Sequence, residues 1–141
     1  MGITNNQKKT LIEMALKVKK IAYAPYSGFF VGAALLSENG NIYTGCNIEN
    51  ASYGATNCGE RTAFFKAISE GEREFVAIAI VGSRKEEEIS TYAFPCGICR
   101  QIMKEFCKDD FLILIARDED HYQEFTLSDL LPYGFGGENL T

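Results

Sequence analysis

Three cysteines and one glutamate form the most informative pattern in this sequence. Cys58 stands two residues before Glu60, and Cys96 and Cys99 follow Pro95 much later in the chain. Three thiolates match the protein ligands of a catalytic zinc site, in which a water molecule takes the fourth position. Glu60 is close enough to Cys58 to reach that water without being a ligand. The pattern therefore predicts a hydrolytic zinc site with Glu60 as its proton carrier.

Both cysteine groups are expected at helix starts. Cys96 and Cys99 have the i, i+3 spacing that places two side chains on one helix face, and Pro95 suits the beginning of a helix. The partial positive charge of a helix N-terminus favours the thiolate, the form that binds metal. Three thiolates leave a zinc complex with negative charge, and we predict that Arg61 offsets this charge through a hydrogen bond to one of them.

Two alternatives use the cysteines differently. A structural zinc site needs a fourth Cys or His ligand, and the remaining residues of these types are Cys46, Cys107 and His121. None has ligand-like spacing, and Cys46 is most simply a small core residue. A redox Cys-x-x-Cys pair leaves the spacing of Cys58 and Glu60 unexplained. The residues favour catalytic zinc over these two alternatives.

Apolar periodicity and turn residues predict an alternation of helices and strands. The expected helices are residues 5–23, 58–70, 96–107 and 127–131, and the expected strands are residues 29–36, 42–46, 75–81, 111–116 and 121–126. Residues 47–57 and 83–94 are expected to be loops. The charge run Lys85–Glu88 in the second loop is typical of a solvated surface.

The last two expected strands are too close in sequence for a parallel crossover. Only residues 117–120 separate them, whereas a parallel connection needs about a dozen residues or more. They are therefore predicted to pair antiparallel. The sequence predicts a single α/β domain over residues 1–141, a three-layer α/β/α sandwich around a mixed five-stranded sheet.

Composition limits the classes of partner that the chain is expected to bind. The chain has 141 residues, of which 46% are apolar, and its net charge is −5. The acidic balance argues against nucleic acid or anionic lipid as a partner but permits a small neutral substrate. Because the chain lacks an apolar run of membrane length and a secretory signal pattern, we expect a cytoplasmic protein. Five cysteines, an odd number, are then expected to be ligands or buried thiols.

Several separated motifs in the right order resemble the small cytidine deaminases that act on free nucleosides. These motifs are residues 25–27 (PYS), 31–35 (VGAAL), 43–54 (YTGCNIENASYG), 57–63 (NCGERTA), 95–101 (PCGICRQ) and 131–136 (LPYGFG). The resemblance covers almost the whole chain. It implies zinc-dependent hydrolysis of cytidine and deoxycytidine to the uridine nucleosides and ammonia, in pyrimidine salvage, with one zinc per chain.

The resemblance also assigns substrate contacts. It implies that Asn47 and Glu49 hold the ribose hydroxyls and that Phe29 forms an apolar wall beside the base or sugar. Tyr53 is implied near the sugar or at an interface, and the backbone N–H of Gly59 is available to the pyrimidine oxygen. From the residues alone, Asn47 and Asn50 are also explained as turn residues and Phe29 as a core aromatic.

Phe135 has two interpretations. By pattern alone it is an exposed aromatic residue that packs locally in a Gly-rich tail. The resemblance implies that it stacks on the base in a neighbouring subunit's site, which predicts a homotetramer with shared sites.

The chain departs from the family pattern at three positions. Gly59 stands where the family usually has Ala, Phe94 replaces a small polar residue, and Gly28 replaces a charged or polar one. The loop of residues 83–94 is also somewhat long. None of these changes removes a ligand or Glu60.

Two other substrate classes fit the sequence less well than ordinary nucleosides do. A deaminase of an aminonucleoside antibiotic such as blasticidin S would share the zinc motifs, but Asn47, Glu49 and the Phe135 tail favour ordinary nucleosides. A polynucleotide editor should carry a basic and aromatic surface, which the acidic balance disfavours.

Overall fold

The computed structural model describes residues 2–84 and 88–140. Its helices are α1 (Asn5–Lys19), α2 (Gly59–Ser69), α3 (Gly97–Phe106) and α4 (Leu127–Leu130), with short 3-10 turns η1 (Tyr53–Ala55) and η2 (Gly137–Asn139). Its strands are β1 (Phe29–Ser37), β2 (Ile42–Cys46), β3 (Phe75–Arg84), β4 (Leu112–Asp118) and β5 (His121–Thr126). None of the helices in these residues is both long and apolar enough to cross a membrane.

The five strands form one mixed sheet in the order β2-β1-β3-β4-β5. β3 and β4 are parallel, and the neighbouring pairs on either side are antiparallel. The β1–β2 hairpin turns at Gly40, whose φ of 92° suits the predicted Asn-Gly turn. β4 and β5 pair antiparallel across a tight connection, as their spacing in the sequence predicts.

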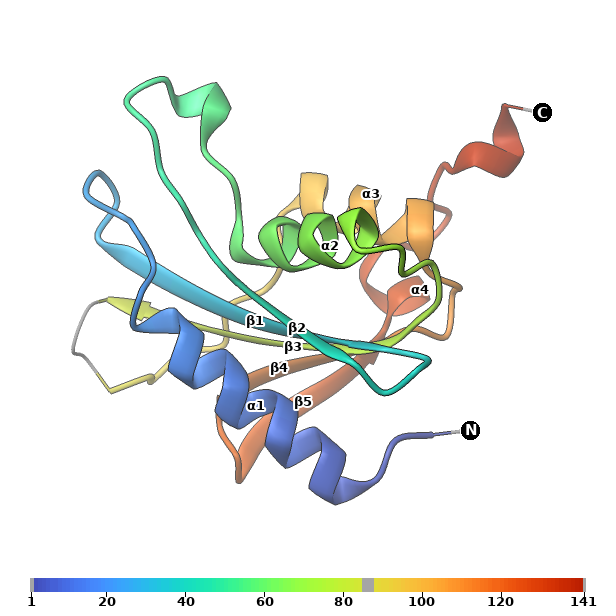
Figure 1. The fold of residues 1–141 in the computed structure, drawn as a ribbon, viewed down its shortest axis with the longest axis horizontal. Helices are drawn as coiled ribbons and strands as arrows, with labels where there is room; N and C mark the ends of the chain where they lie inside the picture. Colours follow the sequence, from blue (N-terminus) through green and yellow to red (C-terminus); the bar gives the residue numbers. More distant parts are fainter. Residues whose placement is uncertain (1, 85–87, 141) are drawn as a thin grey trace.

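Helices cover both faces of the sheet (Figure 1). Side chains alternate along β1, so Ala33 and Leu35 point to one face while Ala34 and Leu36 point to the other. The first face packs against α2 and α3 and includes Phe64 in its core, and the second packs against α1. The predicted three-layer sandwich is confirmed.

The main differences from the predicted elements are at the end of the first helix, at the end of β3 and in the loop after β2, and the other bounds differ by one or two residues at most. The first helix ends at Lys19 rather than at residue 23, because the backbone of Tyr23 pairs with the loop after β2. β3 continues to Arg84, since its last residues pair with the start of β1. The loop after β2 contains the 3-10 turn η1. Of the predicted charge run Lys85–Glu88, residues 85–87 lie outside the described residues, and Glu88 is exposed.

Candidate metal centre and substrate site

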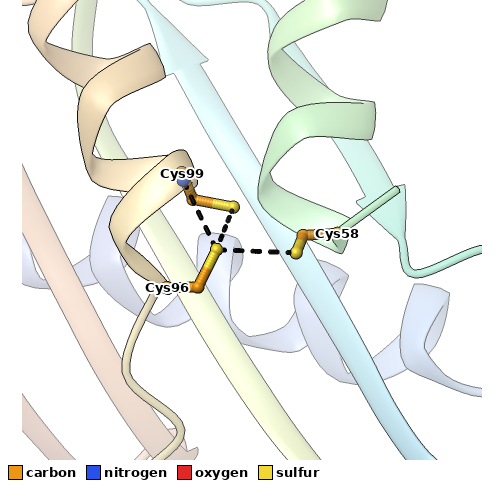
Figure 2. A group of neighbouring side chains, drawn as sticks. All are labelled: Cys58, Cys96 and Cys99. Carbon is orange, nitrogen blue, oxygen red and sulfur yellow. Dashed lines mark hydrogen bonds between the residues drawn. The ribbon is translucent and has the colours of Figure 1, made fainter. Parts of the chain in front are cut away.

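The three predicted cysteines come together between two helix N-termini. Cys58 is the N-cap of α2, Cys96 is the N-cap of α3, and Cys99 lies in the first turn of α3. The Sγ atoms of Cys58 and Cys96 are 3.8 Å apart, and those of Cys96 and Cys99 are 3.5 Å apart (Figure 2). All three sulfurs lie within 4.8 Å of one another.

This spacing fits zinc. A tetrahedral Zn²⁺ with Zn–S bonds of about 2.3 Å requires sulfurs separated by about 3.8 Å. Within residues 2–84 and 88–140, the group of possible metal ligands has three members, as a catalytic site requires. His121 instead contacts Asp118 beside the β4–β5 turn, and burial raises the pKa of both Cys46 and Cys107. All five cysteines are free thiols.

A glycine in β2 sets the position of α2. A Cβ atom on Gly45 would lie 2.4 Å from the backbone N of Ala63 and 2.4 Å from the carbonyl O of Gly59. Only a residue without a side chain lets α2 rest this closely on β2. Gly45 therefore determines how deep the helix that begins beside Cys58 sits over the sheet.

Arg61 contacts one of the three sulfurs. Its Nη2 lies 3.1 Å from Cys58 Sγ. A hydrogen bond from the Cys99 thiol lowers the pKa of Cys58, and the Arg61 guanidinium lowers it further. The same hydrogen bond between the two cysteines, together with burial, raises the pKa of Cys99. The Arg61 guanidinium therefore favours the thiolate form of Cys58.

Glu60 is buried in the first turn of α2, with 5% of its surface exposed. Burial raises its pKa to about 7, the negative charge of Cys58 adds to this effect, and the Cys99 side chain hydrogen-bonds to the carboxylate. A carboxyl group with a pKa near neutrality both accepts and donates protons readily. The structure thus places a buried carboxyl group that titrates near neutrality against the three-sulfur cluster.

Asn47 bridges to β1 at the point where β2 ends. Its Oδ1 accepts a hydrogen bond from the N–H of Val31 (2.9 Å), and its Nδ2 donates one to the carbonyl of Phe29 (2.8 Å). The side chain therefore replaces backbone pairing. The turn interpretation instead describes Asn50, whose Oδ1 accepts the N–H of Ser52. Each group of the Asn47 amide retains bonding capacity for a ligand.

The other predicted contact residues lie around the same loop. Glu49 is half-buried and hydrogen-bonds to the turn before β1, at Tyr26 and Ser27. Phe29 is half-buried, and its ring lies against Gly82 of β3. Tyr53 is exposed and stands edge-on to Tyr26, with ring centroids 6.0 Å apart.

A short run of backbone hydrogen bonds joins this loop to the three-sulfur cluster. Ile48 and Asn57 exchange both backbone hydrogen bonds, each 2.9 Å long. On the other side, Tyr23 donates to the carbonyl of Asn47 and accepts from the N–H of Glu49. Asn57 immediately precedes Cys58. The loop that carries Asn47 and Glu49 is therefore held in register with the start of α2.

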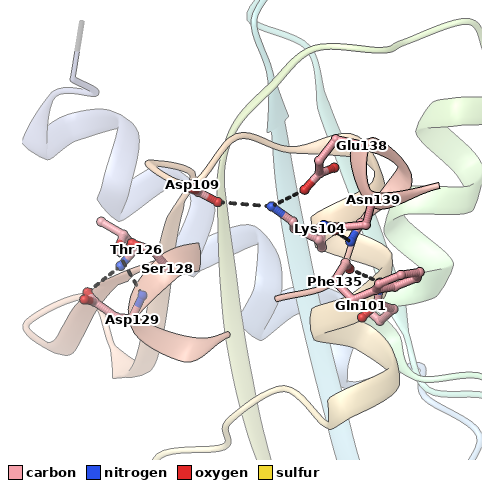
Figure 3. A network of polar contacts seen from close by, with 10 residues as sticks. Gln101, Lys104, Asp109, Thr126, Ser128, Asp129, Phe135, Glu138 and Asn139 are labelled. Atoms are coloured by element: carbon pink, nitrogen blue, oxygen red, sulfur yellow. Dashed lines mark hydrogen bonds and ion pairs between the residues drawn. The ribbon is translucent and has the colours of Figure 1, made fainter. Parts of the chain in front are cut away.

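The C-terminal tail is fixed to α3 (Figure 3). Gln101 Nε2 donates to the carbonyl of Phe135 at 2.7 Å, and Lys104 Nζ forms ion pairs with Glu138 (3.1 Å) and Asp109 (3.5 Å). The side chain of Phe135 remains 56% exposed. The tail therefore presents this ring rather than burying it in its own chain.

The three departures from the family pattern have local explanations. A Cβ on Gly59 would lie 3.3 Å from Cys46 Cα and 3.3 Å from Val31 Cγ1, so Gly relieves a tight contact there. Phe94 packs edge-on against Phe125, with ring centroids 5.4 Å apart. Gly28 has a φ of 68°, a conformation that favours glycine.

Two features of the site were not predicted as such. Ser27 belongs to the recognised PYS motif, but its hydroxyl contact with Glu49 emerges only in the fold. In the sequence, a serine between Pro-Tyr and Gly indicates a turn. That turn and the acidic residue in the loop after β2 are the only indications of this contact. Gln101, part of the second cysteine motif, holds the tail through its amide.

The fold and site together define a zinc-dependent hydrolase of the three-cysteine type. The family model described as the cytidine and deoxycytidylate deaminase zinc-binding region matches residues 5–115, and the chain belongs to this family.

Individual relatives agree with this assignment. The cytidine deaminase of Halalkalibacterium halodurans is 48% identical over 133 residues, which cover 94% of this chain and 97% of the relative. That of Sporosarcina psychrophila is 48% identical over 131 residues, or 93% of each chain. The crystal structure of cytidine deaminase from Burkholderia pseudomallei superposes with a TM-score of 0.82 and 44% identity, covering 94% of this chain and 100% of that one.

Proposed function

We propose that this protein hydrolyses cytidine and deoxycytidine to uridine and deoxyuridine, with release of ammonia. The observation that carries the proposal is the burial of Glu60 against a three-sulfur cluster whose geometry fits zinc. The 48% identical relatives named cytidine deaminase support the choice of substrate.

Each member of the centre has a proposed role. Cys58, Cys96 and Cys99 hold the ion, and Arg61 offsets the charge of the thiolates. Zinc bound there supplies a Lewis acid that lowers the pKa of a bound water to about 7. Glu60 then takes a proton from the attacking water as the new C–O bond forms at the pyrimidine C4.

Glu60 also completes the reaction. It delivers the proton to the ring N3, takes the second proton of the water, and gives it to the amino group as the C4–N bond breaks. One carboxylate can serve each step because it is not occupied as a ligand. Water and cytidine are thus converted to uridine and ammonia with all protons accounted for.

The remaining residues bind the nucleoside in this proposal. Asn47 and Glu49 contact the ribose hydroxyls, Phe29 walls the base or sugar, and the backbone N–H of Gly59 meets the pyrimidine oxygen. Tyr53 lies near the sugar or at a subunit interface.

The assembly belongs to the same proposal. We infer a homotetramer in which Phe135 stacks on the base in a neighbouring subunit's site. Exposed large apolar side chains support an interface; they occur in the loop after β2, between the cysteines of α3 and in the tail, at Tyr53 (75%), Ile98 (60%), Tyr133 (106%) and Phe135 (56%). A cytoplasmic location and a single domain over residues 1–141 complete the proposal, and the five free thiols support a reducing compartment.

The test is the ultraviolet absorbance of cytidine incubated with purified protein, beside metal analysis and a Glu60→Gln control. We expect the cytidine band to disappear with the wild type and persist with Glu60→Gln, while both proteins carry about one zinc per chain. Zinc without any loss of cytidine would overturn the substrate and direct the search to other aminated nucleosides.

A further inference from the structure

The turn between α1 and β1 is firmly built around Ser27. The N–H of Gly28 closes the turn on the carbonyl of Ala24 at 3.1 Å, and Gly28 adopts a φ of 68°. Pro25 restricts the backbone at the opposite side of the turn. Ser27 therefore presents its groups from a fixed backbone, although its side chain is on the surface.

The Ser27 hydroxyl connects two residues expected at the sugar. Its Oγ donates to Glu49 Oε2 at 2.5 Å and accepts a hydrogen bond from the N–H of Phe29 at 3.0 Å. A hydroxyl has one proton, and because an ionised carboxylate can only accept, that proton is donated to Glu49. The same oxygen thus fixes Glu49 and the first residue of β1 relative to each other.

The turn uses most of the accepting capacity of Glu49. Oε1 accepts two backbone N–H groups, from Tyr26 at 2.9 Å and from Ser27 at 3.1 Å, and Oε2 accepts the Ser27 hydroxyl. A carboxylate offers about four acceptor positions. Among the described residues, donors occupy three of these positions, and the one that remains lies on Oε2.

The ionisation of Glu49 agrees with this arrangement. The Ser27 hydroxyl, followed by the two backbone N–H groups, lowers the pKa of Glu49. The carboxylate is therefore charged at neutral pH and can only accept a hydrogen bond. A ligand group at its free position must be a donor, such as a hydroxyl.

We propose that Ser27 is a positioning residue for sugar recognition, which aims the single free acceptor position of Glu49 Oε2 at a ribose hydroxyl. The inference rests on the proposed function, because it takes the nucleoside as the ligand. It predicts that selection for a hydroxylated sugar depends on a hydroxyl that does not itself touch the substrate.

The experiment compares cytidine with 2′,3′-dideoxycytidine, which lacks both hydroxyls, in steady-state assays of the zinc-loaded protein. We expect Ser27→Ala to lower kcat/KM for cytidine about tenfold, the size of one charge-assisted hydrogen bond. The loss is expected in KM, with kcat for cytidine retained. Turnover of dideoxycytidine should stay at the wild-type level, so that the preference for cytidine shrinks. Ser27→Thr keeps a hydroxyl and should keep the preference.

Two further variants make the outcome decisive. Ser69→Ala removes a hydroxyl that bonds to the carbonyl of Lys66 at the far end of α2, and it should match the wild type. Glu49→Gln should reduce the preference for cytidine at least as much as Ser27→Ala does. Zinc content and the thermal unfolding midpoint confirm that each variant is folded.

Failure of the positioning role can be distinguished from failure of the proposed function. If Ser27→Ala keeps the full preference while Glu49→Gln loses it, the positioning role is wrong and the sugar contact of Glu49 stands. If Ser27→Ala slows both nucleosides equally, Ser27 has a structural role only, which also overturns the inference. If the wild type turns over neither nucleoside, the proposed function itself fails.

Discussion

Ile48 and Asn57 pair through both of their backbone hydrogen bonds, and this pair connects the loop after β2 to the first cysteine of the three-sulfur cluster. Ile48 lies between Asn47 and Glu49, and Asn57 precedes Cys58. The loop at Ile48 is therefore tied to the segment that leads into α2. The pair fixes Asn47 and Glu49, the proposed sugar contacts, relative to the helix that carries the buried Glu60.

Breaking this pair should disturb sugar binding. Ile48→Pro removes the N–H that Asn57 accepts, and we expect it to lower the free energy of unfolding by about 1–3 kcal/mol and to raise KM for cytidine. Ile48→Ala keeps the N–H and trims a side chain that is 48% exposed, so it serves as the control. Urea unfolding and steady-state kinetics measure both effects. Equal behaviour of the two variants would show that the backbone pair is unimportant.

The cysteine cluster and Glu60 could be predicted because short-range rules place them. Cys58 and Glu60 are two residues apart at a helix start, and Cys96 and Cys99 share one helix face, so only the approach of the two helices was left to tertiary structure. The continuous apolar run of residues 29–36 similarly predicted a buried strand.

The contacts that hold the loop after β2 in place could not be predicted in the same way. The helical pattern runs on to Ile21, but the helix ends at Lys19 and the Tyr23 backbone bonds to Asn47 and Glu49 instead. Such pairing depends on segments about 25 residues apart in the chain, and helical periodicity contains no information about it. The bridging role of the Asn47 amide depends equally on where β1 lies.

Removing the guanidinium beside Cys58 should weaken metal binding. Arg61→Ala deletes the hydrogen bond of 3.1 Å to Cys58 Sγ, and we expect zinc affinity to fall about 10- to 100-fold. Competition with a chromophoric chelator measures the affinity. Arg73→Ala, at the opposite end of α2, is the control, because Arg73 bonds to the carbonyls of Ile68 and Glu72. Unchanged affinity in Arg61→Ala would contradict a charge-offsetting role.

The close contact of β2 with α2 predicts a strong effect of one methyl group. Gly45→Ala places a Cβ 2.4 Å from backbone atoms of α2, so the helix must shift, at a cost of about 1–3 kcal/mol in unfolding free energy. We also expect lower zinc content, because Cys58 moves with the helix. Gly54→Ala, where a Cβ meets open space, is the matched control in urea unfolding. Equal stability of the two variants would argue against this packing.

Glu72 should make stability depend on pH. It is buried and accepts hydrogen bonds from Asn39 (2.9 Å), Asn41 (3.1 Å) and Tyr43 (2.9 Å) of the β1–β2 hairpin, and these side chains, led by Asn41, lower its pKa below 4.5. A depressed folded-state pKa stabilises the protein above the unfolded-state value, and this stability is lost as pH falls through the folded-state value.

The measurement is the difference in unfolding free energy between the wild type and Glu72→Gln. We expect the wild type to be more stable at pH 7 and the difference to shrink below pH 4.5 as the carboxylate is protonated. Taking the difference cancels effects of acid on the metal cluster, which both proteins share. A difference that is constant across this range would mean that the charge of Glu72 contributes nothing.

Sharing of sites between subunits can be tested by mixing two defective proteins. Phe135→Ala is expected to raise KM for cytidine about tenfold or more, since an aromatic ring stacked on a base contributes about 1–3 kcal/mol, and to leave zinc content unchanged.

The second defective protein, Glu60→Gln, is expected to be inactive. In a mixed oligomer, a site can combine Glu60 from the first variant with Phe135 from the second. Dissociating and reassembling the two variants together should therefore restore a fraction of sites with wild-type KM. Activity that remains at the Phe135→Ala level after subunit exchange, verified by mass spectrometry of the mixed oligomers, would place Phe135 outside the neighbouring site.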